Sequence, residues 1–319
     1  MGLLVEGEWR DQWYETKSSG GRFVRKQSTF RDWVRAEGST AFVPEAGRYH
    51  LYVSLACPWA HRTLIFRALK RLESVISVSV VDPLMAEDGW VFGSAPGGTA
   101  DDVNGVQFLH QIYTLAEPKF TGRVTVPVLW DRKTSTIVNN ESSEIIRMFN
   151  SEFDAFGDPS VDLYPESLRS EIDELNAYIY PRINNGVYRC GFATTQEAYE
   201  EAYGELFEGL DEIDARLEER RYLLGSHVTE ADWRLFTTLV RFDAVYVGHF
   251  KCNRQRIADF ENLSGYLRDL YQVPGVSDTV SMTHIKRHYY ESHRSINPTA
   301  VVPLGPELNL DASHGRERL

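Results

Sequence analysis

The sequence has little of several features that would point to particular classes of protein. It contains only three cysteines, an odd and sparse set that cannot form a disulfide framework. Acidic residues outnumber basic ones, 46 to 34, and the net charge of −12 argues against a nucleic-acid-binding surface. No apolar run approaches the roughly 18 residues of a membrane-spanning helix, and the first residues are too acidic for a signal peptide. We therefore expect a cytoplasmic protein with no nucleic-acid or membrane partner.

Metal-binding patterns are also missing. No spacing of His, Cys, Asp or Glu in the sequence fits a metal site, so no metal is expected. Cys190 and Cys252 are most simply small buried residues. The remaining cysteine, Cys57, lies in a more informative setting.

Cys57 lies between a predicted strand and a predicted helix. Residues 48–53 are largely apolar, as in a half-buried strand, and residues 59–72 have the pattern of a helix. Pro58 suits the first helical turn, because its missing N–H would have no partner there. A thiol at the start of a helix has a pKa below its free value of roughly 8.5, and its thiolate is a nucleophile. The alternative is a small buried core residue.

The residues after Cys57 decide what kind of nucleophile it would be. A dithiol redox motif needs a second cysteine two or three residues later, but Ala60 stands there. The thiol would therefore react with an external partner. His61 lies on the same helical face and is expected to have a structural role.

The first half of the chain predicts a thioredoxin-like domain. A β-branched run at 75–81 adds a strand parallel to the first, and the segments 124–131 and 135–138 form a hairpin followed by a helix over 141–148. Residues 84–119 are expected to be an irregular insertion. Pro127 inside a strand indicates an edge position or a cis bond.

The second half has the period of helices. They are expected over 168–179, over 197–217 with its end at Gly225, over 233–247 after a capping box at Thr229–Asp232, over 262–271 and over 282–290. The fold class is therefore α/β, with a thioredoxin-like domain followed by an all-α domain. The predicted divisions are an N-terminal extension with little regular structure packed on the domain (1–47), the thioredoxin-like domain (48–150), a linker (151–165), the helical domain (166–291) and an extended tail (292–319).

This layout is that of glutathione transferases, and several segments resemble the Xi class of that family, the glutathionyl-hydroquinone reductases. The segments are 57–62 (CPWAHR), 125–131 (TVPVLWD), 140–142 (NES), 144–147 (EIIR), 185–193 (NGVYRCGFA), 242–246 (FDAVY), 249–253 (HFKCN) and 284–290 (HIKRHYY). A CPWA turn also occurs in omega-class enzymes, so the segments 185–193 and 242–253 are the specific ones.

The resemblance implies a binding site for glutathione as co-substrate. Glu141 and Ser142, at the start of a helix, would hold its α-ammonium and α-carboxylate. Val126, before Pro127, would pair with its cysteinyl backbone as an added strand does. On sequence alone, an ordinary helix cap and a bulged edge strand explain the same residues.

Five further residues complete the implied site. Trp90 and Arg123 would bind the glycyl carboxylate of glutathione. Tyr188, Tyr246 and Tyr289 would line the hydroquinone pocket, with Tyr188 or Tyr289 donating a proton. Without the resemblance, Trp90 is an aromatic side chain covering the surface, Arg123 a solvated charge, and each tyrosine a packed core residue.

The implied reaction is glutathione-dependent reduction of glutathionyl-hydroquinones through a Cys57–glutathione mixed disulfide, with release of oxidised glutathione. The alternatives are an omega-like thioltransferase or dehydroascorbate reductase, and a non-catalytic binding module with the same fold. The resemblance also implies a homodimer.

Overall fold

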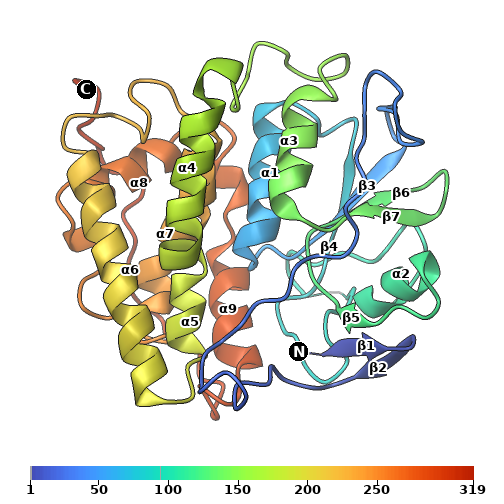
Figure 1. Ribbon diagram of the computed structural model, residues 1–319, viewed down its shortest axis with the longest axis horizontal. Helices are drawn as coiled ribbons and strands as arrows, with labels where there is room; N and C mark the ends of the chain where they lie inside the picture. The colour runs from blue at the N-terminus through green and yellow to red at the C-terminus, as the bar shows by residue number, and fades with distance from the viewer. Residues whose placement is uncertain (1, 94) are drawn as a thin grey trace. The chain divides into compact units, whose positions relative to one another are not determined.

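Figure 1 shows the computed structural model, which describes residues 2–93 and 95–319. The chain forms two compact units, each assembled from segments that are separated in the sequence. The first unit comprises Met1–Trp13, Gln27–Val161 and Asp278–Val302, and the second comprises Tyr14–Lys26, Asp162–Ser277 and Pro303–Leu319. Within the described residues, no helix has the length and apolar character needed to cross a membrane.

The first unit contains the predicted thioredoxin-like sheet. Its strands, in spatial order, are β4 (Ser77–Val80), β3 (Tyr49–Val53), β6 (Val128–Asp131) and β7 (Thr136–Asn139). The β3–β4 pair is parallel, and β6 runs antiparallel to both β3 and β7. Every residue of β3 is buried, whereas the sequence pattern predicted a half-buried strand; β3 is an inner strand, between β4 and β6. Helices α1 (Pro58–Leu69) and α3 (Ser142–Ser151) pack against each other in the same unit. The expected order, βαβ followed by ββα, is confirmed.

The N-terminal extension has little regular structure, as expected, but the expectation that 84–119 is wholly irregular is wrong. The N-terminal extension contains β1 (Leu3–Val5) and β2 (Glu8–Arg10), which form a small antiparallel sheet with β5 (Gly122–Arg123). The region 84–119 contains helix α2 (Leu109–Ala116), whose start is capped by the Gln111 side chain accepting the Phe108 N–H at 2.9 Å. The short strands and α2 were not predicted individually, because strands of two or three residues and an eight-residue helix are too short to show a period.

The second unit is helical, as predicted. It contains α4 (Arg169–Ile179), α5 (Gly186–Gly191), α6 (Gln196–Arg216), α7 (Glu230–Arg241) and α8 (Leu263–Tyr271), with π-helical turns at Tyr180–Asn184 and Phe242–Tyr246. The last helix, α9 (Met282–Ser292), belongs to the first unit.

The structure tests two sequence predictions about helix ends, namely the capping box at Thr229 and the end of α6. The capping box is confirmed, because the Asp232 carboxylate accepts both the Thr229 N–H at 2.8 Å and the Thr229 hydroxyl at 2.9 Å. The predicted end of α6 at Gly225 is wrong. The helix ends at Arg216, and Gly225 takes a φ of +114° in a separate turn that pairs with Tyr222. Glycine is suited to that turn because it accepts positive φ without steric cost.

Candidate active site

Cys57 lies where the sequence predicts, at the junction between β3 and α1. It is the residue just before the first helical position, and Pro58 occupies that position. Its backbone carbonyl accepts the His61 N–H at 3.0 Å, so Cys57 begins the helical hydrogen-bond ladder. The side chain is half-buried. A thiol here is exposed to the positive end of the helix dipole and remains accessible to a ligand.

The Cys57 thiol faces the loop that contains Val126. Its sulfur donates to the Val126 carbonyl oxygen over 3.6 Å. The peptide bond between Val126 and Pro127 is cis, and β6 begins only at Val128, so Pro127 lies outside the strand. The structure therefore brings together two of the predicted site residues that lie far apart in the sequence.

A residue that the sequence did not single out, Tyr113 of α2, fixes this loop. Its buried hydroxyl donates to the Thr125 carbonyl oxygen at 2.9 Å and accepts from the Asn140 side-chain amide at 3.1 Å. Burial raises the pKa of Tyr113, so the hydroxyl keeps its proton. Only the tertiary fold shows that Tyr113 hydrogen-bonds to this loop, because helix α2 was not expected.

Glu141 and Ser142 form the start of α3. The Glu141 carboxylate accepts the N–H of Ser143 at 3.1 Å, the hydroxyl of Ser143 at 2.9 Å and the hydroxyl of Ser28 at 3.1 Å. Ser142 is buried, and its hydroxyl accepts from the Arg62 guanidinium at 3.4 Å. The region is thus a polar network around one carboxylate.

The charge state of Glu141 follows from these partners. Burial alone would raise the pKa of Glu141, but the hydrogen bonds from Ser143 and the nearby Arg62 charge outweigh it, so the pKa is lowered. The carboxylate is therefore ionised at neutral pH. A negative charge at this position can bind an ammonium group.

Trp90 and Arg123 are both held by contacts within the first unit. The Trp90 side chain is 7% exposed, and its ring stacks on His288 of α9 with the centroids 4.8 Å apart. The Arg123 guanidinium donates to the backbone carbonyl oxygens of Gln12 and Trp13. Arg123 is therefore not simply a solvated charge in a turn, because its hydrogen bonds also hold the N-terminal segment in place.

The three predicted pocket tyrosines do not all fall in one unit. Tyr188 and Tyr246 lie in the second unit with ring centroids 6.1 Å apart, and each ring is 5.4 Å from that of Phe250. Tyr289 lies on α9 in the first unit, where its ring contacts His288 and His293. The structure thus brings Tyr188 and Tyr246 together in an aromatic cluster of the second unit.

The two other cysteines and His61 occupy buried positions, as expected of structural residues. Cys190 and Cys252 are buried, and burial together with the neighbouring Cys190 thiol raises the pKa of Cys252. His61 is buried, and its Nε2 shares a hydrogen bond of 2.7 Å with the Thr279 hydroxyl. In the ranges 2–93 and 95–319, no group of three or more His, Cys, Asp or Glu side chains is arranged to hold a metal ion.

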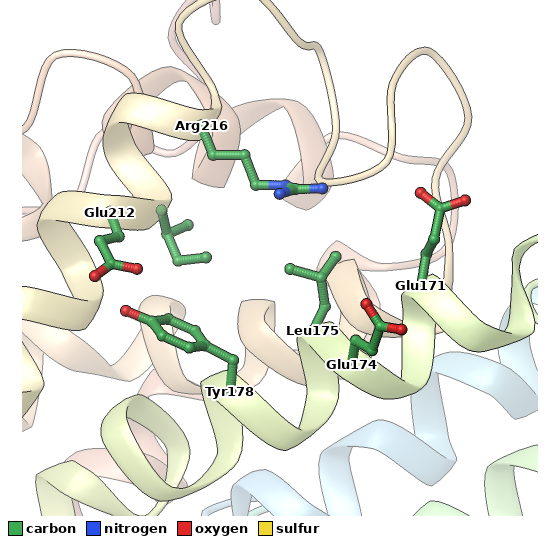
Figure 2. Close-up of a pocket in the computed structure, with 7 residues that line it drawn as sticks. Glu171, Glu174, Leu175, Tyr178, Glu212 and Arg216 are labelled. Atoms are coloured by element: carbon green, nitrogen blue, oxygen red, sulfur yellow. The ribbon is translucent and has the colours of Figure 1, made fainter.

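A cavity of about 320 Å³ lies between α4 and α6 in the second unit (Figure 2). Its lining is Glu171, Glu174, Leu175, Tyr178, Glu212, Ile213 and Arg216. None of the predicted site residues is among them. Three carboxylates against one guanidinium would repel glutathione, which has a net negative charge at neutral pH.

Comparison with known proteins agrees with this fold. The family described as "Glutathione S-transferase, N-terminal domain" matches residues 56–152, and the one described as "Glutathione S-transferase, C-terminal domain" matches residues 196–269. The chain belongs to the glutathione S-transferase family and, within it, to the Xi class.

Individual relatives cover nearly the whole chain. The glutathionyl-hydroquinone reductase YqjG of Escherichia coli K12 is 57% identical over 99% of each chain. The glutathione-bound structure of YqjG gives a TM-score of 0.92 at 53% identity over 99% of each chain. The Xi-class transferase of Natrialba magadii gives 0.96 at 55% identity, over 100% of this chain and 98% of that one. A protein of Schizosaccharomyces pombe named as omega-like glutathione S-transferase 2 is 50% identical, over 92% of this chain and 96% of its own.

Proposed function

We propose that this protein reduces glutathionyl-hydroquinones to hydroquinones with glutathione as the reductant. The observation that carries the proposal is the half-buried Cys57 thiol at the start of α1, 3.6 Å from the Val126 carbonyl oxygen. The 57% identity with a glutathionyl-hydroquinone reductase over almost the full length supports the same activity.

The first step transfers the glutathionyl group to the enzyme. The Cys57 thiolate attacks the glutathione sulfur, an S–S bond forms, and the bond between sulfur and the aromatic carbon breaks. The electron pair of that bond stays on the ring carbon, which takes a proton and becomes the C–H of the hydroquinone. Because an aromatic carbon is a poor leaving group, a proton donor is needed, and a phenol at Tyr188 or Tyr289 can serve.

The second step regenerates the thiolate. The thiolate of a second glutathione attacks the glutathionyl sulfur of the mixed disulfide, releases Cys57 as a thiolate and leaves as oxidised glutathione. Overall, the glutathionyl-hydroquinone and one glutathione give the hydroquinone and one oxidised glutathione. A cysteine is needed for this route because only a protein thiol can itself accept the glutathionyl sulfur, whereas a hydroxyl at this position would favour conjugation.

Glutathione would lie along the surface of the first unit in an extended form. The Glu141 carboxylate would pair with its α-ammonium, and the start of α3 at Ser142 would receive its α-carboxylate. Val126 would pair with the cysteinyl backbone, which brings the ligand sulfur next to Cys57. Trp90 and Arg123 would bind the glycyl carboxylate, through an indole N–H and a guanidinium.

The hydroquinone would bind to tyrosines. Tyr188 and Tyr246 already form part of an aromatic cluster, and a flat quinol ring can stack on such rings and accept hydrogen bonds from their hydroxyls. Tyr289 would contribute from α9.

We further propose a cytoplasmic location, supported by three free cysteines, and a homodimer, which light scattering on a size-exclusion column would test.

The omega-like relative supports a second candidate function, the reduction of simple mixed disulfides or dehydroascorbate with the same Cys57.

The proposed function is tested by steady-state turnover of a glutathionyl-hydroquinone with excess glutathione, in which free hydroquinone is quantified. Cys57→Ala is expected to abolish turnover, whereas Cys252→Ala, the matched control that removes another thiol, is expected to keep it. If the wild type reduces only mixed disulfides or dehydroascorbate, the omega-like function replaces the proposed one.

A further inference from the structure

The N-terminal segment 14–26 is part of the second unit and packs against its aromatic side chains. Tyr14 and Phe23 are in ring contact with each other at 4.7 Å, and Phe23 contacts Phe192 at 5.2 Å. These rings continue into those of Tyr188 and Phe250, which contact Phe192 at 5.8 and 5.1 Å. The segment therefore extends the aromatic cluster that contains Tyr188.

One cation of this segment, Arg25, lies over the cluster. Its guanidinium carbon is 5.1 Å from the centroid of the Tyr188 ring and 5.3 Å from that of Phe23. Its Nε donates to the Asn185 side-chain oxygen at 3.1 Å, and Asn185 is the residue before the first position of α5. Arg25 is half-buried, so part of its surface remains accessible.

Other contacts fix the segment that contains Arg25. The Arg22 guanidinium donates to the Glu201 carboxylate of α6 at 2.9 and 2.6 Å. The Thr194 N–H donates to the Gly21 carbonyl oxygen at 3.0 Å, and a Cβ at Gly21 would lie 2.5 Å from the Thr195 hydroxyl oxygen. The backbone thus approaches the start of α6 at a distance that only glycine allows. The position of Arg25 is therefore set by the fold.

We propose that Arg25 is a specificity-determining residue that favours hydroquinones bearing an anionic substituent, such as a carboxylate, on the ring. The inference rests on the proposed function, in which a quinol ring binds against Tyr188. A guanidinium forms strong, charge-assisted hydrogen bonds with a carboxylate because its planar N–H groups match the two oxygens. The protein has a net charge of −12, and a fixed cation at this ring offsets the general repulsion of anionic substrates.

The test compares two substrates, a glutathionyl-hydroquinone with no further substituent and one with a carboxymethyl group on the ring. We expect Arg25→Gln to lower kcat/KM for the carboxymethyl substrate roughly ten-fold or more, and for the unsubstituted one by less than about two-fold. Arg25→Lys keeps the charge without the planar fork and should recover part of the difference. Raising the salt concentration should reduce the wild-type preference.

Arg22→Gln is the matched control, because it removes a guanidinium that holds the same segment but pairs with Glu201. It should change both substrates by the same factor. An equal loss for the two substrates in Arg25→Gln would overturn the inference and leave Arg25 a packing residue. If the wild type reduces neither substrate, the proposed function itself fails, and the inference fails with it.

Discussion

Replacing Glu141 with glutamine would test the proposed glutathione site while leaving the start of α3 largely intact. A glutamine side chain can keep the network, because its oxygen can accept from Ser143 and its amide can donate to the Ser28 hydroxyl that now donates to the carboxylate. Only the negative charge is lost. Because the helix cap changes and the nearby buried Arg62 loses a favourable charge, we expect the free energy of unfolding to fall by about 1–2 kcal/mol.

The expected loss of glutathione affinity is larger. A hydrogen bond between an ammonium and a carboxylate contributes about 1.5–3 kcal/mol, so the Kd for glutathione should rise roughly 10- to 100-fold in Glu141→Gln. The pKa of Glu141 is lowered, so its charge and the stability it contributes are present at neutral pH and are lost as the pH falls through that lowered value. Calorimetric titration at pH 7 measures the affinity.

A glutathione analogue without the α-amino group shows which part of the ligand Glu141 contacts. The wild type should bind the analogue 10- to 100-fold more weakly than glutathione, whereas Glu141→Gln should bind the two about equally. Glu144→Gln is the matched control, since this neighbouring carboxylate already pairs with Arg31 at 2.7 Å. Equal discrimination by wild type and Glu141→Gln, or an equal effect of Glu144→Gln, would refute the assignment.

Two further predictions concern stability in the first unit. Asp131→Asn should lower the free energy of unfolding by about 3 kcal/mol in urea titrations, because the buried Arg48 guanidinium, now 2.7 and 2.9 Å from the carboxylate, would keep only the exposed Glu45 carboxylate at 3.8 Å as a countercharge. A loss below about 1 kcal/mol would contradict this. Burial lowers the pKa of His50, which lies between the hydroxyls of Ser77 and Ser79, to about 4. The unfolded chain therefore takes up this proton first, and stability should fall by up to about 1.4 kcal/mol per unit as the pH drops from about 6.5 towards 4. That part of the slope should be absent in His50→Gln.

The elements that could be predicted from the sequence are those whose signals are local. The strand, proline and helix around Cys57 were predicted correctly because a short apolar run and an N-terminal proline are each visible within a few residues, although the strand is more buried than expected. The capping box at Thr229 was visible for the same reason. The sheet of β1, β2 and β5 was missed because the pairing of Leu3 with Arg123 joins distant parts of the chain.

The candidate site likewise has features that could be predicted from the sequence and features that could not. Cys57 and the start of α3 could be proposed from short motifs, but their supporting contacts could not. Tyr113 holds the Thr125 carbonyl from a helix too short to predict, and Arg25 reaches Tyr188 only through the tertiary fold. These contacts depend on packing between segments, which sequence periodicity does not report.

The most direct test of the account is a single turnover without free glutathione. The protein is mixed with an equal amount of glutathionyl-hydroquinone, and the intact mass and the released hydroquinone are measured together. We predict one glutathionyl group per chain, located at Cys57 by peptide mapping, with one hydroquinone released and the adduct removed by added glutathione. Hydroquinone release without an adduct, or an adduct on Cys190 or Cys252 instead, would contradict the proposed role of Cys57.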